Sequence, residues 1–257
     1  MNAQPVLSQV DARGVATVTL NRPEVNNAYD ESLIQGLHAA MDSLAGVRVV
    51  LLRGAGKHFQ AGADLKWIAR VAAQSMEENE RVSWATALAV QRLNTLPVPT
   101  VALVQGGCFG GGTGVVAACD VVIAADNAMF SIAETRWGLT AAIILPQLAD
   151  AIGARQVRRY ALSGERFGAE EARRIGLVHE VVPLAGLEAA GARMVDQLLQ
   201  NAPQANAETK GTILDYAWGR PGEDAMHRLV KEHAAKRRSR EAAEGLASFS
   251  EKRAARW

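Results

Sequence analysis

The sequence predicts an α/β fold built around a largely parallel sheet. Three segments are rich in β-branched residues and have the composition of buried strands: 47–54, 100–106 and 120–125. Helical patterns lie between them, and a strand-helix-strand order is the usual connection between parallel strands. No short period repeats along the chain, which argues against a solenoid of short repeats.

Local patterns predict the elements of the first half. Residues 15–20 (VATVTL) alternate apolar and polar side chains, as a half-buried strand does. Asp30 suits the N-cap of a helix that runs to about Leu44, because its carboxylate can accept hydrogen bonds from the first unpaired N–H groups. Two further helices are expected, at 64–71 and at 74–94, and the second ends before a Pro-Val-Pro segment.

The second half is predicted to be mainly helical. A short helix is expected at 113–119, before the strand at 120–125. Three helical patterns follow after about residue 140, at 141–153, 154–164 and 168–178. Residues 203–256 are also helical in pattern and increasingly charged. We therefore expect a core at 1–200 and a helical C-terminal region at 201–257.

Composition limits the classes of function. The chain has 257 residues, of which 49% are hydrophobic and 21% charged, which is ordinary for a globular protein with one large domain or one domain and an appended piece. The formal net charge of +1 gives the whole molecule no strong attraction to nucleic acid or to anionic membranes. No apolar run reaches membrane-spanning length, and the first 14 residues lack the pattern of a signal peptide.

Cysteine and histidine usage indicates neither a disulfide scaffold nor a metal centre. Cys108 and Cys119 match no CxxC or metal-finger spacing, and the five histidines form no HExxH pair. We therefore expect no bound metal and a reduced, cytoplasmic setting.

A glycine-rich stretch, QGGCFGGGTGVVAACD at 105–120, joins a predicted buried strand to a helix. It fits neither GxGxxG nor GxxxxGK[ST], so a nucleotide cradle is not expected. Two readings stay open: close packing of helix on sheet, or exposed backbone N–H groups that bind a developing oxyanion. A second loop of small residues, HFQAGADLK at 58–66, also follows a buried strand. One N–H donor from each loop could converge on a thioester carbonyl oxygen as it becomes an enolate.

Further motifs occur in order along nearly the whole chain: TLNRPEVNNA, FQAGADLK, VQGGCFGGGTGVVAACDVVIAAD, FSIAETRWGL, ALSGERFGAEEARRIGLVHEVVP and the terminal FSEKR. In this order and spacing they resemble the crotonase family, also called the enoyl-CoA hydratase/isomerase superfamily. The resemblance implies a crotonase-like spiral of ββα units with a helical C-terminal trimerisation region, and homotrimers that often pair into hexamers.

The resemblance also implies a site for an acyl-CoA thioester, with CoA as part of the substrate and no separate cofactor. It places the two oxyanion donors at the backbone N–H groups of Ala63 and Gly111. Other positions that it places along the CoA are Ala61, Asp64, Leu65, Lys66, Phe249 and Lys252. The last two belong to a C-terminal motif that often approaches CoA from a neighbouring subunit.

The chain departs from the two-base hydratases of this family at one position. They carry one glutamate just after the glycines and a second on a later turn, whereas this chain has Gly114 and Glu134 at these positions. Glu134 is therefore the expected acid/base, while Asp120 is expected to be structural. A single carboxylate suits either hydration or Δ3–Δ2 double-bond isomerisation, because both pass through a thioester enolate. Arg136 could pack locally or contact a carboxylate on the acyl group.

The motif combination most resembles bacterial hydratases of branched glutaconyl-CoA thioesters, which likewise lack the first glutamate. That group includes 3-methylglutaconyl-CoA and isohexenylglutaconyl-CoA hydratases, from leucine and acyclic terpene degradation. The sequence analysis thus favours a hydro-lyase of this type. A CoA- or RNA-binding protein without activity is an alternative, because residues 228–256 contain nine Lys or Arg against four Glu. We expect no nucleic acid partner, since no aromatic-basic stacking motif accompanies these charges.

Overall fold

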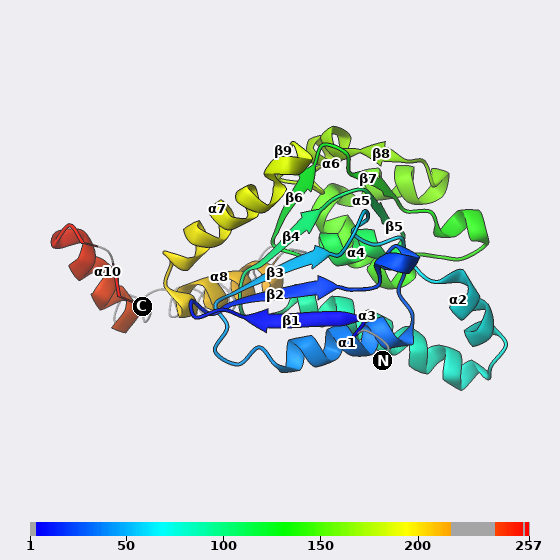
Figure 1. The fold of residues 1–257 in the computed structure, drawn as a ribbon, viewed down its shortest axis with the longest axis horizontal. Coiled ribbons are helices and arrows are strands. Elements are labelled where there is room, and N and C mark those ends of the chain that lie inside the picture. The colour runs from blue at the N-terminus through cyan, green and yellow to red at the C-terminus, as the bar shows by residue number, and fades with distance from the viewer. Residues whose placement is uncertain (1–3, 217–239, 254, 257) are drawn as a thin grey trace.

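A six-stranded sheet forms the centre of the molecule in the computed structural model, which describes residues 4–216, 240–253 and 255–256. Its strand order is β1-β2-β3-β4-β6-β9 (Figure 1). Only the β1–β2 pair is antiparallel, and all the other pairs are parallel. The strands are β1 (Val6–Val10), β2 (Val15–Leu20), β3 (Val49–Gly54), β4 (Thr100–Val104), β6 (Val121–Ala125) and β9 (Glu180–Val182).

A second, three-stranded sheet has the order β5-β7-β8. Its strands are β5 (Gly107–Phe109), β7 (Met129–Ser131) and β8 (Phe167–Gly168). β4 and β5 are separated by two residues, and β6 and β7 by three, so the chain passes twice from the large sheet into the small one. This succession of paired strands followed by helices agrees with the α/β fold that the sequence patterns predict and with the spiral of ββα units that the family resemblance implies.

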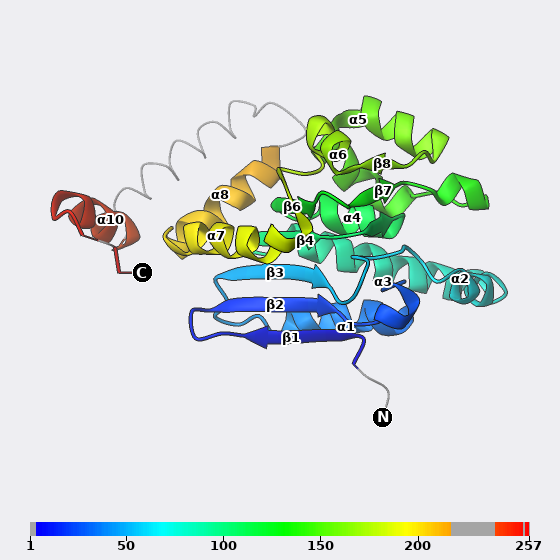
Figure 2. The same cartoon turned by 45° about the horizontal axis from the view of Figure 1, so that its top comes forward.

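Helices cover both faces of the large sheet. The helices of the described chain are α1 (Glu31–Asp42), α2 (Leu65–Ala72), α3 (Met76–Asn94), α4 (Gly111–Ala117), α5 (Leu145–Ser163), α6 (Ala169–Ile175), α7 (Leu187–Leu199), α8 (Pro203–Tyr216) and α10 (Arg240–Ser250). Short 3-10 turns lie at Pro23–Val25, Glu134–Trp137, Ala142–Ile144 and Leu184–Gly186. α4 lies between α3 and α5, in contact with both (Figure 2).

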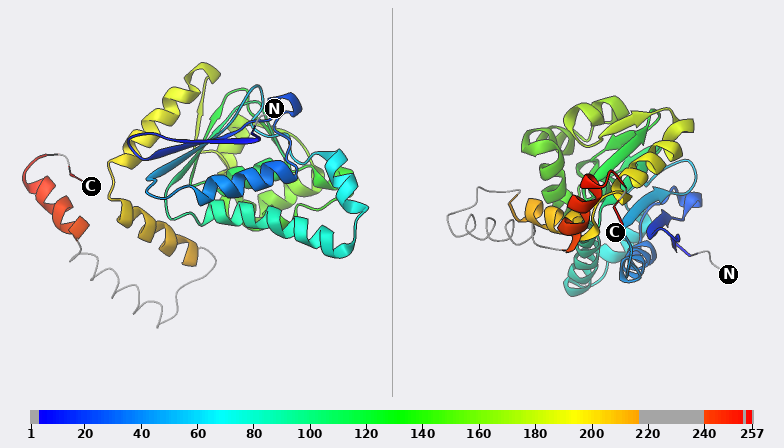
Figure 3. Two further views of the ribbon diagram at one scale, coloured as in Figure 1. Left: turned by 60° about the horizontal axis from the view of Figure 1, so that its bottom comes forward. Right: turned by 90° about the vertical axis from the view of Figure 1, so that its left-hand side faces the viewer.

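Alternation along the strands assigns side chains to two cores, because successive residues of a strand point to opposite faces. Val18, Leu52 and Val104 belong to the larger core, which includes side chains of α1, α3, α4 and α5. Val49 and Val101 belong to a separate core with α7. Figure 3 shows α1 and α3 on one side of the sheet and α7 on the other. The central strands are therefore buried on both faces, as the near-continuous apolar runs of the sequence indicate.

The structure confirms most predicted elements to within a few residues. Asp30 caps α1 by accepting a hydrogen bond from the N–H of Leu33, at 3.2 Å. The helix predicted at 113–119 begins two residues earlier, at Gly111. The two patterns expected at 141–153 and 154–164 form one element, α5, with non-helical backbone angles at Gly153.

The sequence analysis missed short strands and one helix. The missed elements are β1, β5, β7, β8, β9 and α7. In particular, Gly107–Phe109 is a strand, although we expected the glycine-rich stretch to be a loop. Two or three residues of strand carry too few alternations to be recognised, and most of β1 faces solvent.

The C-terminal region is described in part. The expected boundary near residue 200 falls between α7 and α8, and the division into two units stays a prediction. Helical structure predicted for 203–256 is confirmed in α8 and α10, while 217–239 lie outside the described residues. Within the described part of the chain, no helix is both long and apolar enough to cross a membrane.

Candidate active site

A cavity of about 670 Å³ lies beyond the carboxyl ends of β3 and β4. This volume is in the range typical of sites for small molecules. One side of it is formed by the segment 58–64, called the first loop, and by the segment 105–111, called the second loop, which contains β5. Side chains of α1, α2 and α3 form a mostly apolar wall. The segment after β7, which contains the 3-10 turn Glu134–Trp137, forms a third part of the lining. The titratable residues in its described lining are Tyr29, Glu134, Arg136 and Arg166.

The first loop presents the N–H group of Ala63. Tyr29 and Ala63 form an isolated parallel bridge, in which the N–H of Tyr29 donates to the carbonyl of Gly62 at 2.8 Å and the N–H of Asp64 donates to the carbonyl of Tyr29 at 2.9 Å. Ala63 lies between the two residues that bond to Tyr29, and in a parallel bridge the residue at this position directs its own N–H away from the partner segment. Accordingly, the N–H of Ala63 has no partner within the described chain, and Ala63 lines the cavity.

The second loop presents the N–H group of Gly111. The N–H of Gly110 donates to the carbonyl of Ser131 at 2.8 Å, and the N–H of Thr113 donates back to the carbonyl of Gly110 at 2.8 Å. The N–H of Gly111 begins α4 and is without a partner among the described residues. Gly111 lines the same cavity as Ala63.

A second bridge holds the two loops together. The N–H of Gln60 donates to the carbonyl of Gly107 at 3.1 Å, and the N–H of Phe109 donates to the carbonyl of Gln60 at 2.9 Å. These bonds fix the relative position of the loops before any substrate is present. Such fixed donors need no reorganisation when charge develops on an oxygen between them.

Gly110 and Gly111 are required because neighbouring side chains approach their α-carbons closely. Gly110 has φ of 50°, and a β-carbon built on it would lie 3.0 Å from Oε1 of Glu134. A β-carbon on Gly111 would lie only 2.6 Å from Cε1 of Tyr29. Close packing, the first of the two readings left open by the sequence, is therefore confirmed. The stretch also leaves the N–H of Gly111 without a partner in the described chain, and its binding of an oxyanion stays a prediction.

Glu134 supplies the carboxylate of the cavity. It begins the 3-10 turn Glu134–Trp137, which the N–H of Leu139 closes by donating to the carbonyl of Glu134 at 3.1 Å. Its side chain is half-buried, and Oε2 is buried without a hydrogen-bond partner in the described structure. Burial raises the pKa of Glu134 above the ordinary value for a glutamate. A carboxyl group with a raised pKa is suited to taking and returning a proton near neutral pH.

Ile144 occupies the space opposite Gly114, where two-base relatives were expected to carry their first glutamate. A β-carbon built on Gly114 would lie 2.2 Å from Cγ2 of Ile144, so even alanine does not fit. Ile144 is itself almost fully buried and lines the cavity. The absence of a carboxylate at position 114 is therefore part of the packing of this site.

The residues expected along CoA fall into two groups. Ala61 and Leu65 line the cavity. Asp64 instead caps α2, because its carboxylate accepts from the N–H groups of Lys66 at 2.8 Å and Trp67 at 3.1 Å. Lys66 is exposed beside the cavity and is not part of its described lining. A contact of CoA with Asp64 or Lys66 stays a prediction.

Phe249 and Lys252 lie far from the cavity of their own chain. Phe249 is in α10, and the exposed Lys252 follows that helix. α10 lies at the opposite end of the molecule from α2 (Figure 1). The side chain of Phe249 lies outside the described residues. If these residues contact CoA, they do so on another subunit.

Asp120 has a structural role, as expected. Its carboxylate accepts from the N–H of Thr100 at 2.7 Å, from Oγ1 of Thr100 at 2.9 Å and from Nζ of Lys210 at 2.8 Å. It therefore joins β4, β6 and α8, away from the described lining of the cavity.

Two arginines reach the cavity without an anionic partner. Arg136 packs against Gly164, where a β-carbon would lie 2.7 Å from its Nε. The guanidinium of Arg166 lies 5.3 Å from the ring centre of Phe109. Both side chains are exposed and line the cavity, and neither forms an ion pair within the described chain. Only Arg136 was recognised from the sequence, by its closeness to Glu134.

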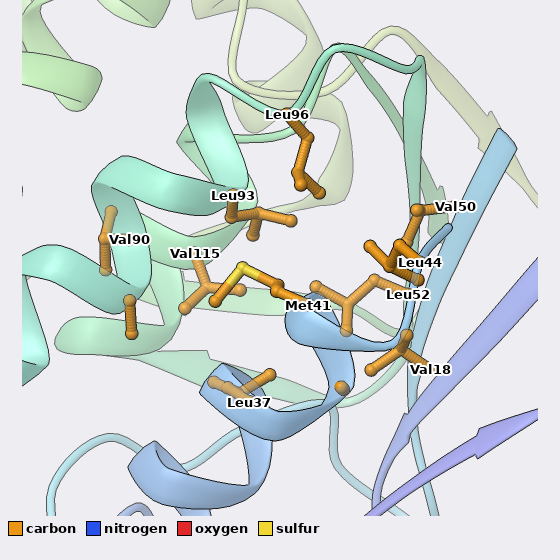
Figure 4. Close-up of a pocket in the computed structure, with 12 residues that line it drawn as sticks. Val18, Leu37, Met41, Leu44, Val50, Leu52, Val90, Leu93, Leu96 and Val115 are labelled. Atoms are coloured by element: carbon orange, nitrogen blue, oxygen red, sulfur yellow. The ribbon is translucent and has the colours of Figure 1, made fainter. Parts of the chain in front are cut away.

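A small apolar cavity of about 30 Å³ adjoins the large one. It lies between α1 and α3, against β2 and β3, and is lined by aliphatic and methionine side chains (Figure 4). Four residues line both cavities: Leu37, Ala89, Val90 and Val115. The two cavities are thus neighbours, separated by side chains that line both.

No cluster of metal-binding side chains occurs in the described part of the chain.

Comparison with known proteins identifies the family. Residues 11–257 match the family model described as "Enoyl-CoA hydratase/isomerase". The chain belongs to the enoyl-CoA hydratase/isomerase family.

The relatives of this enoyl-CoA hydratase/isomerase family member include hydratases and an isomerase. The chain is 34% identical over 249 residues to mevalonyl-coenzyme A hydratase sidH of Aspergillus fumigatus, covering 95% of this chain and 91% of that protein. It is 30% identical over 262 residues to the mitochondrial Delta(3,5)-Delta(2,4)-dienoyl-CoA isomerase of Dictyostelium discoideum, covering 96% and 88%. The crystal structure of an enoyl-CoA hydratase from Shewanella pealeana superimposes with a TM-score of 0.94 at 33% identity, covering 98% and 96%. These similarities confirm the expected crotonase-type fold.

Proposed function

We propose that the protein is a hydro-lyase that adds water across the α,β double bond of a branched enoyl-CoA thioester. One observation carries the proposal. A half-buried carboxylate with an unpartnered oxygen, on Glu134, shares an apolar-walled cavity with the unpaired N–H groups of Ala63 and Gly111. Two donors and one proton acceptor are the groups that enolate formation from a thioester requires.

In the proposed mechanism the thioester oxygen accepts hydrogen bonds from Ala63 and Gly111. Glu134 takes a proton from water, whose oxygen attacks the β-carbon. The π electrons move onto the thioester oxygen and form the enolate. The carboxyl of Glu134 then gives its proton to the α-carbon, which completes the addition. Each oxyanion donor contributes on the order of 3 kcal/mol to the stability of the transition state.

The test is the Glu134→Gln variant, which keeps the side-chain shape and removes the base. We expect turnover of the enoyl-CoA substrate to fall by roughly 10²–10⁴-fold. Binding of a saturated acyl-CoA, measured by calorimetry, should persist. Near-full turnover of the variant would place the base elsewhere and would reject the proposed mechanism.

Isomerisation between Δ3 and Δ2 double bonds is the second candidate. It is favoured by the packing of Ile144 against Gly114, which leaves one carboxylate to move a proton between two carbons. Product identification separates the candidates. Crotonyl-CoA is converted to a hydroxyacyl-CoA only by a hydratase, whereas a 3-enoyl-CoA is converted to its conjugated isomer by an isomerase.

For the acyl group we propose a glutaconyl-type thioester with a carboxylate and an apolar branch, such as 3-methylglutaconyl-CoA or isohexenylglutaconyl-CoA. Arg136 and Arg166 support the carboxylate, because two guanidinium groups without an ion-pair partner in the described structure face a cavity with one glutamate. The aliphatic space behind Val90 and Val115 supports the apolar branch. This substrate class would place the enzyme in leucine or acyclic terpene degradation.

Substrates with and without a carboxylate on the acyl group test the two arginines. We expect Arg136→Met and Arg166→Met each to raise KM for 3-methylglutaconyl-CoA by about tenfold, since a charge-assisted hydrogen bond contributes about 1.5–3 kcal/mol. For neutral crotonyl-CoA the change should be small. CoA is common to both substrates, so equal losses would show that the arginines bind CoA or support the fold.

We also propose a homotrimer, or a hexamer of two trimers, in which α10 reaches a neighbouring subunit. Two features of the described chain support this assembly: α8 buries none of its residues, and its Ile213 is 62% exposed. A cytoplasmic location stays a prediction from the cysteines, both of which are buried and free.

A further inference from the structure

Tyr29 is a polar group of the cavity that the proposed mechanism does not use. It comes directly before the N-cap residue of α1, and its ring lines the cavity. Its hydroxyl forms no hydrogen bond with the described residues. A phenol that faces a ligand cavity without a protein partner is available to a ligand oxygen.

Tyr29 contacts both residues that carry the oxyanion donors. Its backbone forms the bridge to Ala63. Its ring lies on Gly111, where a β-carbon would be 2.6 Å from Cε1 and 3.2 Å from Oη of Tyr29. The hydroxyl is therefore beside the α-carbon of one donor residue, while the main chain of the same tyrosine fixes the other.

The ring of Tyr29 is held in place from a third side. Trp67, which is buried, meets it edge to face, with 5.8 Å between ring centres and 70° between planes. The main-chain bridge and the aromatic contact limit the movement of the hydroxyl. A donor that is already fixed stabilises developing charge without a cost of reorganisation.

The protonation state of Tyr29 suits donation and excludes a role as a base. Burial, with a smaller contribution from the negative charge of Glu134, raises the pKa of Tyr29 to about 12. The phenol thus keeps its proton throughout the neutral range. Glu134 and Tyr29 also lie beside two adjacent residues, Gly110 and Gly111, so the two side chains are near one another.

We propose that the hydroxyl of Tyr29 donates a third hydrogen bond to the thioester oxygen, beside the N–H groups of Ala63 and Gly111, and strengthens it as the enolate forms. No proton is transferred, so Glu134 keeps its role as the acid/base. Tyr29 then acts on the reacting atoms as a catalytic residue. The inference rests on the proposed enolate chemistry and assigns one more residue to it.

The test compares Tyr29→Phe with Tyr160→Phe. Tyr160 is a matched control, since its pKa is likewise raised to about 12 but its hydroxyl donates to Glu171, away from the described lining of the cavity. We expect Tyr29→Phe to lower kcat for crotonyl-CoA hydration by roughly 10–100-fold, somewhat less than a main-chain donor costs. KM should change little, and Tyr160→Phe should keep its kcat.

A spectroscopic titration separates charge stabilisation from packing. Acetoacetyl-CoA forms an enolate that absorbs ultraviolet light, and the pKa of the bound thioester reports how well the site stabilises that charge. We expect this pKa to be higher on Tyr29→Phe than on the wild type, by one to two units for a 10–100-fold effect. Full turnover with an unchanged enolate pKa would overturn the inference. A lower kcat with an unchanged enolate pKa would also overturn it, because the hydroxyl would then act elsewhere.

Failure of this inference is distinguishable from failure of the proposed function. If Tyr29 has no role, the wild type still hydrates crotonyl-CoA and Glu134→Gln still loses that activity. If the proposed function is wrong, the wild type itself shows no hydration, and the titration of bound acetoacetyl-CoA remains as the direct readout of the oxyanion site.

Discussion

At the scale of single residues, Gly114 and Ile144 pack so closely that no larger side chain fits at position 114. The isoleucine side chain fills the position that a side chain at 114 would need. A hydratase with two carboxylates therefore cannot be recovered from this chain by one substitution. The absence of a carboxylate at position 114 follows from packing as well as from the identity of the residue.

We predict that Gly114→Ala destabilises the protein by about 1–3 kcal/mol, because overpacking a buried site has this cost. Ile144→Ala removes Cγ2, the nearest atom at 2.2 Å, but keeps Cβ at 2.5 Å from the added β-carbon, so the double variant should recover only part of the loss. Urea unfolding of the wild type, both single variants and the double variant measures the coupling. Strict additivity of the two effects would contradict the contact.

Glu134 should make stability depend on pH. Its raised pKa means that the folded state holds the proton more tightly than the unfolded state. Stability from this residue is present below the unfolded pKa and is lost as pH rises through the folded pKa. We therefore predict a higher Tm for Glu134→Gln than for the wild type at pH 7.5, with a gap that narrows toward pH 4.5. The exposed Glu24, changed to Gln, is the control and should show no such gap.

At the scale of elements, the sequence predicts the parts of the site better than their connection. Buried strands show near-continuous apolar runs and capped helices show periodic patterns, so β3, β4, α1 and α2 were located closely. Ala63, Gly111 and Glu134, which the family motif selects, all line one cavity, while their catalytic roles stay predictions. The bridge between Tyr29 and Ala63 has no sequence pattern, because it depends on chain segments that meet only in the folded molecule. For the same reason the roles of Arg166 and Ile144 were not foreseen.

The N–H of Gly111 can be tested at the start of α4 with a matched pair of variants. Gly111→Pro removes the N–H but also adds a β-carbon against Tyr29. Gly111→Ala adds the same β-carbon and keeps the N–H, so the ratio of the two variants isolates the donor. We predict kcat for the proline variant to be lower than for the alanine variant by roughly 10²-fold, with similar affinity for saturated acyl-CoA. Equal kcat values would remove Gly111 from the oxyanion site.

At the scale of the whole molecule, the candidate catalytic residues and the C-terminal motif lie at opposite ends (Figure 1). α8 is joined to the sheet by Lys210 and Asp120, and Glu241 of α10 accepts from the N–H groups of Gln204 and Ala205 at the start of α8. α10 thus extends the molecule beyond α7 and α8 (Figure 2). If Lys252 contributes to CoA binding, the complete site contains parts of two chains.

Subunit complementation tests this shared site. We predict that Glu134→Gln and a chain ending at residue 239 are each nearly inactive alone, and that their mixed trimers regain activity. About one site in four should then join an intact Glu134 to a neighbour's α10, because each of the two conditions is met with a probability of about one half in random trimers. Activity equal to the sum of the separate chains would show that α10 does not serve a neighbouring site. The full-length Lys252→Glu variant repeats the test if the shortened chain does not fold, since reversing this charge weakens phosphate binding without removing the helix.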